Sequence, residues 1–497
     1  MSLLKKLTLL LLSVSIFTAC QQAAPEAETQ TETTAPTAET YEKPRVPDWH
    51  KNATIYEVNV RHYTPEGTFA AFSKHLPRLK DMGIDILWFM PLHPISKKNR
   101  KGGMGSPYAV ADYRDTNPDY GTKEDFKKMV EAIHAQGMYC IIDWVPNHTG
   151  WDNPWITEHP EWYTQDKDGN IIDPIDYNTG ESWGWTDVAD LNYDVPEMRL
   201  GMIDAMKYWV TDMNADGFRV DVAHGVPVDF WAQATDSLYA VKPLFMLAEA
   251  EVPAIVNNGA FVTDYGWDMH HLLNEVAETQ KASRLPGKKS SLGEISEKEK
   301  APGAPKTLAD IDALLAKKDS IYRKGYQMHF TSNHDENSWS GTEFQRFGDA
   351  HLAFAVLTAT FDGMPLIYTG QEAAVDKQFE FFEKDEVPWG EFKYHDFYKT
   401  LFSLKHRNQA LWNGVHGGNF TKIATGKDDN IYAFMREKDG DRVVVVINFS
   451  AQKQAFILGG DAVAGKYTDV FAGTERELTA GGGMTLEPWA YTVFSGK

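Results

Sequence analysis

The sequence predicts an α/β protein: a (β/α)8 TIM barrel with a small domain B inserted after the third strand and a C-terminal antiparallel β-sandwich domain. From about residue 46 onward, eight short apolar runs alternate with amphipathic segments, and after about residue 412 the helical pattern stops. Such alternation is typical of parallel strands joined by helical crossovers, and eight units favour a closed barrel over an open sheet.

The eight predicted strands are apolar runs bounded by turn residues or by helical segments. The run 138–145 is apolar almost throughout, as a strand buried on both faces should be. It follows a predicted helix over 122–136 that Gly137 ends. The predicted strands are 53–60, 84–91, 138–145, 215–223, 244–250, 261–265, 326–331 and 364–368.

Two insertions and a change of pattern define the predicted domains. Asp143 and Asp221 lie 78 residues apart, whereas a barrel unit needs about 30. The excess, 149–190, is predicted to be domain B on the face where barrel active sites lie. The stretch 281–306 is expected to be a surface loop. The predicted domains are the barrel at 46–411, domain B within it, and the β domain at 412–497, which contains strand runs at 431–435 and 442–449 joined through Asp439-Gly440.

The N-terminus is predicted to be an export signal and not part of the fold. Lys5 and Lys6 precede an apolar run at 7–17, which is too short to span a bilayer, so 1–19 is interpreted as a signal peptide. Thr18-Ala19-Cys20 resembles a bacterial lipoprotein processing site, and 20–45 is expected to be a flexible tether that begins at a lipidated Cys20. We therefore expect an exported protein that a lipid anchors to the membrane of the cell envelope, the outer membrane in a Gram-negative host. The alternative is ordinary cleavage nearby.

Composition excludes several functions. The formal net charge is −21, which would repel phosphate backbones, so nucleic-acid binding is not expected. The two cysteines, Cys20 and Cys140, exclude a disulfide framework and a cysteine-based zinc site. The chain contains 15 Trp, 21 Tyr and 26 Phe, and an acidic protein so rich in aromatic rings is typical of a sugar-stacking surface as well as of a large core.

Acidic residues end four of the predicted strands. Asp143, Asp221, Glu249 and Asp335 follow strands three, four, five and seven. Several carboxylates at one barrel mouth repel one another, so folding alone gives no reason for the arrangement, whereas a paired acid and base is its usual use. Arg219, two residues before Asp221, faces the same side of its strand and is expected to hold Asp221 ionised.

Glu249 is expected to differ from Asp221 in its protonation. It ends an apolar run beside other carboxylates, so we expect its pKa to be raised. Glu251 is an acidic rival two residues further on, and Glu249 is preferred because it directly ends the strand.

These segments resemble a known family. DWVPNH at 143–148, GFRVDVA at 217–223, Glu249 after strand five, and SNHD at 332–335 resemble the four short regions that define the α-amylase family of glycoside hydrolases. The resemblance covers about 50–497 and implies a retaining enzyme that cleaves α-1,4-glucosidic bonds of starch, maltodextrin or cyclodextrin. It implies that Asp221 is the nucleophile, Glu249 the general acid/base and Asp335 the stabiliser of the transition state. The implied substrate-binding residues are Tyr108, Asp143, His148, Arg219 and His334.

The sequence also departs from classical α-amylases. Where they tend to show Lys-His after the nucleophile, this chain has His224-Gly225, which favours the neopullulanase and oligo-α-glucosidase side of the family. Asn147 and Asp190 are oxygen donors beside domain B and are weak calcium candidates; the chemistry itself is expected to need no cofactor. Trp183 and Trp185 are candidate sugar platforms in domain B, and the alternative is that they form its small core. A glucanotransferase of the same family is the first alternative, and a non-catalytic glucan-binding protein is the distant one.

Overall fold

The computed structural model describes residues 45–176, 179–282, 284–285 and 305–497. The predicted signal peptide, Cys20 and nearly all of the tether, together with most of the 281–306 insertion, lie outside these residues. Within the described residues, none of the helices has both the length and the apolarity needed to cross a bilayer.

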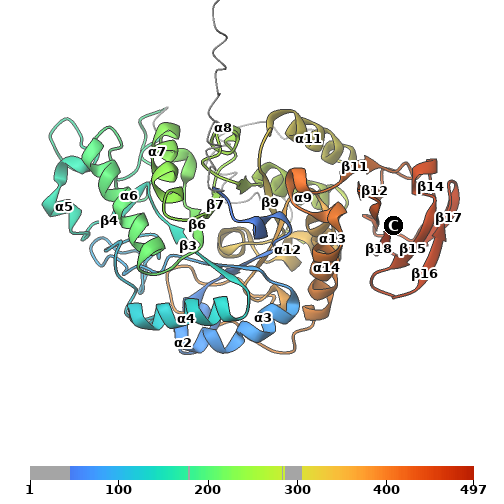
Figure 1. Ribbon diagram of the computed structural model, residues 1–497, viewed down its shortest axis with the longest axis horizontal. Helices are drawn as coiled ribbons and strands as arrows, with labels where there is room; N and C mark the ends of the chain where they lie inside the picture. Colours follow the sequence, from blue (N-terminus) through green and yellow to red (C-terminus); the bar gives the residue numbers. More distant parts are fainter. Residues whose placement is uncertain (1–44, 177–178, 283, 286–304) are drawn as a thin grey trace, which may run out of the picture. The chain divides into compact units, whose positions relative to one another are not determined.

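Eight parallel strands close into a barrel, which confirms the predicted fold class (Figure 1). The order around the barrel is β1-β10-β9-β8-β7-β6-β3-β2. The first strand is shorter than predicted, because the side chain of Asn59 accepts the His62 N–H and starts a helix. The barrel strands are β1 Ile55–Val58, β2 Ile86–Phe89, β3 Tyr139–Trp144, β6 Gly217–Val220, β7 Phe245–Ala248, β8 Thr263–Tyr265, β9 Tyr326–Phe330 and β10 Met364–Tyr368.

Helices surround the barrel strands (Figure 1). Helix α4 shows how sequence sets the bounds: Thr122 and Asp125 form a reciprocal capping box at its start, and Gly137 with a φ of 68° follows its end. The helices are α1 Val60–Tyr63, α2 Phe69–Phe72, α3 Leu76–Met82, α4 Lys123–Ala135, α5 Trp155–Glu158, α6 Pro196–Thr211, α7 Val228–Tyr239, α8 Pro253–Asn257, α9 Trp267–Thr279, α11 Leu308–Ile321, α12 Glu343–Phe347, α13 His351–Thr360 and α14 His395–Arg407.

Large apolar side chains fill the barrel interior. They come from β1, β2, β3, β7 and β9, among other strands, and include Ile55, Trp88, Ile141, Phe245 and Met328, all of which are fully buried. The barrel is therefore a packed core and not a pore, so a ligand has access only to the ends of the strands.

The long connection between β3 and β6 returns to its starting point. Strand β4 (His148–Gly150) pairs antiparallel with β5 (Val188–Asp190), and this register sets His148 opposite Asp190. Both ends of the inserted segment are thereby fixed at the carboxyl end of β3. We keep 149–190 as the proposed bounds of domain B.

The C-terminal segment is an antiparallel β domain, as predicted. A six-stranded sheet has the order β11-β12-β13-β18-β15-β16, and β14 pairs with β17 in a second sheet. Residues of both sheets, such as Val444 and Phe456, share one apolar core. The predicted hairpin turn is present, with φ of 51° at Asp439 and 93° at Gly440. The strands are β11 Asn419–Lys422, β12 Ile431–Lys438, β13 Asp441–Asn448, β14 Gln454–Leu458, β15 Gly465–Asp469, β16 Glu475–Leu478, β17 Gly482–Leu486 and β18 Tyr491–Gly496.

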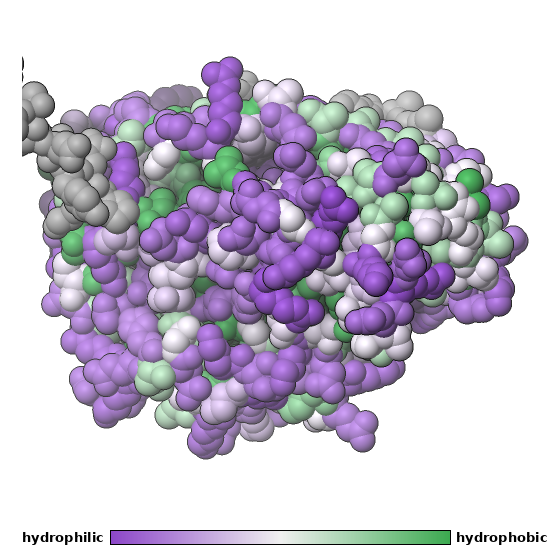
Figure 2. Space-filling model, turned by 45° about the vertical axis from the view of Figure 1, so that its right-hand side comes forward, coloured by the Kyte–Doolittle hydropathy of each residue, from purple (hydrophilic) through white to green (hydrophobic). Residues whose placement is uncertain are grey.

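Polar side chains cover most of the face shown in Figure 2. This agrees with the 24% of charged residues in the chain. Hydrophobic groups also reach the surface, as they do in folded proteins generally.

Candidate active site

The carboxyl ends of the barrel strands meet at a cavity of about 860 Å³. Asp221, Glu249 and Asp335 all line it, although they belong to segments that follow three different strands. Their side chains are nevertheless at most about one-fifth exposed. Three acidic groups therefore share one partly enclosed space, which is costly unless cations or protons compensate them.

Backbone hydrogen bonds fix Asp221 and Glu249 on neighbouring strand ends. The Asp221 N–H donates to Trp144 O at 2.8 Å, and the Glu249 N–H donates to Val220 O at 2.9 Å. Between them, Val222 has a φ of 44° and gives its N–H to Glu249 Oε2 at 2.9 Å. A β-branched residue in the left-handed region costs about 1–3 kcal/mol, and here that conformation directs a donor at a carboxylate.

One guanidinium joins three carboxylates beneath the cavity. Arg219 Nη1 lies 2.8 Å from Asp143 Oδ1 and 3.0 Å from Asp221 Oδ1, while Nη2 lies 2.9 Å from Glu249 Oε1. Its Nε donates to the hydroxyl of Tyr265 at 3.0 Å. The predicted contact between Arg219 and Asp221 is present, but Arg219 holds Glu249 just as closely.

This shared contact changes the expected protonation of the pair. Burial and the neighbouring Glu249 raise the pKa of Asp221 well above its ordinary value, against the opposing effect of Arg219. Burial also acts to raise the pKa of Glu249, but Arg219 and the Val222 N–H outweigh it and hold that pKa below its ordinary value. The expectation of a raised pKa for Glu249 is therefore wrong in direction for the protein without substrate. The physical reason is that Glu249 receives a cation and a backbone donor.

A second cation, the His334 ring, lies beside Asp335. His334 Nδ1 is 2.5 Å from Glu57 Oε1, and its Nε2 is 3.4 Å from Asp335 Oδ2 and 2.8 Å from the Tyr108 hydroxyl. Burial acts to lower the pKa of His334, but Asp335 and Glu57 raise it to about 9. His334 is thus charged at neutral pH. Sequence analysis missed Glu57, whose only signal is an acidic residue within an apolar strand.

Burial also shifts the remaining acids. The pKa of Asp335 is raised to about 6, since burial outweighs the attraction of His334. The pKa of Asp143 is likewise raised to about 6 by burial, against Arg219. The Tyr108 hydroxyl donates to Asp143 Oδ2 at 3.0 Å, so hydrogen bonds connect His334 through Tyr108 and Asp143 to Arg219.

The predicted substrate-binding residues separate into two groups. Tyr108, His148 and His334 line the cavity. Asp143 and Arg219 are completely buried and do not line it. Their contact with substrate stays a prediction; in the structure they contact Tyr108, Asp221 and Glu249, which do line the cavity.

Aromatic rings form two walls of the cavity. The first consists of Trp183 and Trp185, the platforms predicted in domain B, whose centroids are 6.0 Å apart and nearly parallel. The second consists of Trp339, Phe381 and Phe382. Sequence analysis missed the second wall because Trp339, which is 45% exposed, and the Phe381-Phe382 pair lie in short irregular segments without a hydrophobic period.

Glu251 also reaches the cavity but has a different setting. Its carboxylate lies 3.0 Å from Lys318 Nζ, which also binds Asp268 at 2.7 Å. Burial and Asp268 raise the pKa of Glu251 to about 8. It has no contact with Arg219 of the kind that Glu249 makes, so the preference for Glu249 over Glu251 agrees with the geometry.

The calcium candidates lie close together but do not by themselves form a metal site. Asn147 and Asp190 are buried at the junction of β4 and β5, and the Asn147 side-chain amide contacts the His148 ring at 3.3 Å. Calcium takes six to eight oxygen ligands. Among the described residues, no group of three or more His, Cys, Asp or Glu side chains could hold an ion. Calcium binding stays a prediction.

Comparison with known proteins places this geometry in a family. Residues 29–441 match the family model described as alpha amylase, catalytic domain, and residues 422–493 match the maltogenic amylase C-terminal domain. Alpha-amylase MalA of Haloarcula japonica is 26% identical over 90% of this chain, which spans 62% of the length of MalA. An oligo-1,6-glucosidase of Parageobacillus thermoglucosidasius is 24% identical over 65% of each chain.

Solved structures of amylases agree with the fold. The maltogenic α-amylase AmyB of Thermotoga neapolitana superposes with a TM-score of 0.76 at 26% identity and covers 90% of this chain and 98% of its own. An α-amylase of Lactobacillus plantarum gives 0.74 at 27% identity, with coverage of 90% and 99%. The first family model spans most of the chain, from the segment before β1 to the first strands of the C-terminal domain. The chain therefore belongs to the α-amylase family of glycoside hydrolases, and it is an enzyme.

Proposed function

We propose that this enzyme hydrolyses α-1,4-glucosidic bonds of maltodextrin, starch or cyclodextrin with retention of configuration. Asp221 acts as the nucleophile and Glu249 as the general acid/base. The observation that carries this proposal is the placement of these two carboxylates at the two ends of the Arg219 guanidinium, 3.0 and 2.9 Å from its nitrogens, in one cavity. Two carboxyl groups close to one anomeric carbon are what double displacement needs.

In the first step, an Asp221 oxygen attacks the anomeric carbon while the glycosidic C–O bond breaks and Glu249 gives its proton to the leaving oxygen. In the second step, Glu249 takes a proton from water, the water oxygen bonds to the anomeric carbon, and the bond to Asp221 breaks. Asp335 stabilises the oxocarbenium-like transition state from a third side. Arg219 and Asp143 are positioning residues, because they touch the reacting carboxylates or their partners and not the cavity.

The chemistry requires a proton on Glu249 and none on Asp221. In the free protein the pKa of Asp221 is raised by burial and by Glu249, and that of Glu249 is lowered by Arg219 and Val222 against burial. Because the two carboxyl groups interact with each other and with one guanidinium, their protonation is coupled and they titrate as a pair. A sugar bound over Asp221, with its glycosidic oxygen at Glu249, favours moving the proton to Glu249.

The aromatic walls supply the sugar platforms. Tyr108 lies nearly parallel to the His334 ring, 5.4 Å away, at the reaction centre. Trp183 and Trp185 offer further flat surfaces in domain B. Flat apolar rings that bury the faces of glucose units favour a chain of several units over free glucose.

Product and stereochemical analysis tests the proposal. We expect maltoheptaose to be shortened, with the α-anomer formed first in a proton NMR time course. Asp221→Asn is expected to lose activity by more than about 1,000-fold and Glu249→Gln by about 100- to 10,000-fold, while Glu251→Gln, the matched acidic neighbour, loses far less. Longer products would indicate a glucanotransferase, and an unchanged substrate would indicate a binding protein.

We also propose that the chain is exported and anchored by a lipid on Cys20. This rests on the sequence alone: the apolar run at 7–17, the small residues before Cys20, and the polar 20–45 stretch. Such an anchor would hold the enzyme at the cell envelope, where polymeric or oligomeric glucans from outside can reach it.

A further inference from the structure

The segment Lys97 to Gly105, which we name the strap, crosses one side of the cavity. It follows β2 and is tied to domain B by Lys101, whose Nζ lies 3.0 Å from Asp187 Oδ1 and donates to Gly184 O at 3.1 Å. Lys101 and Asp187 both line the cavity, and Lys101 is the sole lysine or arginine that does so among the described residues.

The other end of the strap is tied to the loop after β10. The Met104 N–H donates to Phe382 O at 3.0 Å, and the Gly103 N–H donates to Glu383 Oε1 at 2.5 Å. The approach is close enough to require glycine: a Cβ at Gly102 would lie 2.4 Å from Phe382 Cβ. The aromatic wall of Phe381 and Phe382 is thus continuous with the strap.

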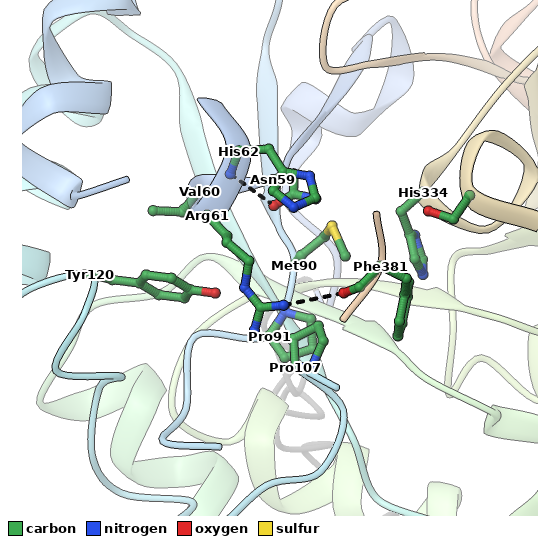
Figure 3. Close-up of a pocket in the computed structure, with 11 residues that line it drawn as sticks. Asn59, Val60, Arg61, His62, Met90, Pro91, Pro107, Tyr120, His334 and Phe381 are labelled. Atoms are coloured by element: carbon green, nitrogen blue, oxygen red, sulfur yellow. Dashed lines mark hydrogen bonds between the residues drawn. The ribbon is translucent and has the colours of Figure 1, made fainter. Parts of the chain in front are cut away.

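A third tie comes from the segment directly after β1. Arg61 Nη1 donates to Gly105 O at 3.1 Å and to Phe381 O at 3.2 Å. Figure 3 shows Arg61 reaching the Phe381 carbonyl, with His334 close to the Phe381 ring. The strap therefore passes over the β1 side of the barrel, with anchors on both flanks.

The barrel order places this strap opposite the general acid. In the closed barrel, β1 lies between β2 and β10. Strand β7, which Glu249 directly follows, is the fourth strand from β1 in either direction. A general acid lies beside the leaving group, so the aglycon lies on the Glu249 side, near Glu251 and Trp267, which also line the cavity. The glycon must then extend toward the strap.

We propose that the strap closes the glycon end of the cavity, so that the enzyme acts on the non-reducing ends of short α-glucans, with Lys101 and Glu383 as specificity-determining residues. This narrows the substrates proposed above to chains with a free end and excludes cyclodextrin. This inference rests on the proposed function. A chain that continued past the reacting sugar would have to displace a segment held by an ion pair and several hydrogen bonds.

End-blocked substrates test the inference. The probes are p-nitrophenyl α-maltoheptaoside and the same compound with its terminal 4- and 6-hydroxyls bridged by an ethylidene group, and the rate measured is loss of substrate by chromatography. We expect the wild type to consume the free form at least about tenfold faster, because the added carbons meet a closed wall. The double variant Lys101→Ala/Glu383→Ala should bring the two rates closer together. Lys98→Ala, exposed on the same strap, should keep the wild-type ratio.

The outcomes separate the two proposals. Equal wild-type rates on both probes overturn the closed glycon end and leave hydrolysis intact. A wild-type preference that the double variant retains overturns the assignment to the strap ties. If neither probe is consumed by folded protein, the proposed hydrolysis fails and the inference fails with it.

Discussion

Replacing Arg219 by alanine is the sharpest perturbation of the site. Its guanidinium is completely buried and contacts Asp143, Asp221 and Glu249 within 3.0 Å. Removing a cation at this distance raises the pKa of an acid by about 1–3 units. Both limbs of the pH profile of kcat/KM should therefore move toward alkaline pH by about that amount, since the nucleophile and the acid lose the same partner.

The size of the effect follows from the shift. At a pH on the acid limb of the profile, a pKa shift of 1–3 units corresponds to about 1.4–4 kcal/mol. This is about a 10- to 1,000-fold loss of kcat/KM, and part of it is regained as the pH rises. Breaking a buried pair also costs about 3–5 kcal/mol of stability. At roughly 2 cal/mol/K of unfolding entropy per residue, that lowers the Tm of a chain of this length by about 3–5 °C.

Two variants isolate the cause. Tyr265→Phe removes only the acceptor of Arg219 Nε and should leave the pH profile in place. Arg219→Lys keeps a charge but not the planar fork that reaches both carboxylates, so its profile should shift less than that of alanine. If the Arg219→Ala profile superposes on the wild type while the protein is folded, Arg219 does not set the protonation of the pair and the assigned role is wrong.

Three further predictions concern charge, anchoring and metal. His334 has a pKa raised to about 9, so its stabilisation is complete below about pH 6.5 and is lost as the pH rises through 9; the Tm deficit of His334→Gln should shrink over that range, and a constant deficit would contradict it. Cys20→Ser should move the enzyme from the detergent-soluble membrane fraction to the soluble fraction; unchanged fractionation argues against lipidation. We expect EDTA to leave activity nearly unchanged. A large drop in Tm on adding EDTA would instead indicate that the protein holds calcium, with Asn147 and Asp190 as the candidate ligands.

The fold was predictable because its signals are local. Each barrel strand is an apolar run, so 138–145 and 326–331 predict β3 and β9 without knowledge of the partners they pair with. The acidic residues at the strand ends are predictable for the same reason, since barrel topology brings every such end to one mouth. The resemblance then supplied their order and the proposed roles.

The electrostatics were not predictable because they depend on contacts distant in sequence. Glu57 and His334 are 277 residues apart, and nothing in either segment indicates the other. The pKa of Glu249 was expected to be raised because Glu249 follows an apolar strand. Instead Arg219, which lies 30 residues earlier on the neighbouring strand β6, contacts Glu249 and lowers that pKa. The contacts that hold the strap were unpredictable for the same reason. Lys101 and Glu383 are charged residues in loops, where charged residues are common and no sequence pattern marks those that form contacts.

The charge balance of the cluster explains how this site can hold the proton that the reaction needs. Five carboxyl groups, Glu57, Asp143, Asp221, Glu249 and Asp335, contact only two cations, Arg219 and His334. Two cations cannot compensate five anions at low dielectric, so burial raises the pKa of Asp143, Asp221 and Asp335 above their ordinary values and favours proton uptake by the cluster. We predict that bound substrate favours a proton on Glu249 and that this proton comes from within the cluster. Because that transfer is internal, calorimetric titration of a maltooligosaccharide into Asp335→Asn, repeated in buffers of different ionisation enthalpy, should show well under one proton exchanged with solvent.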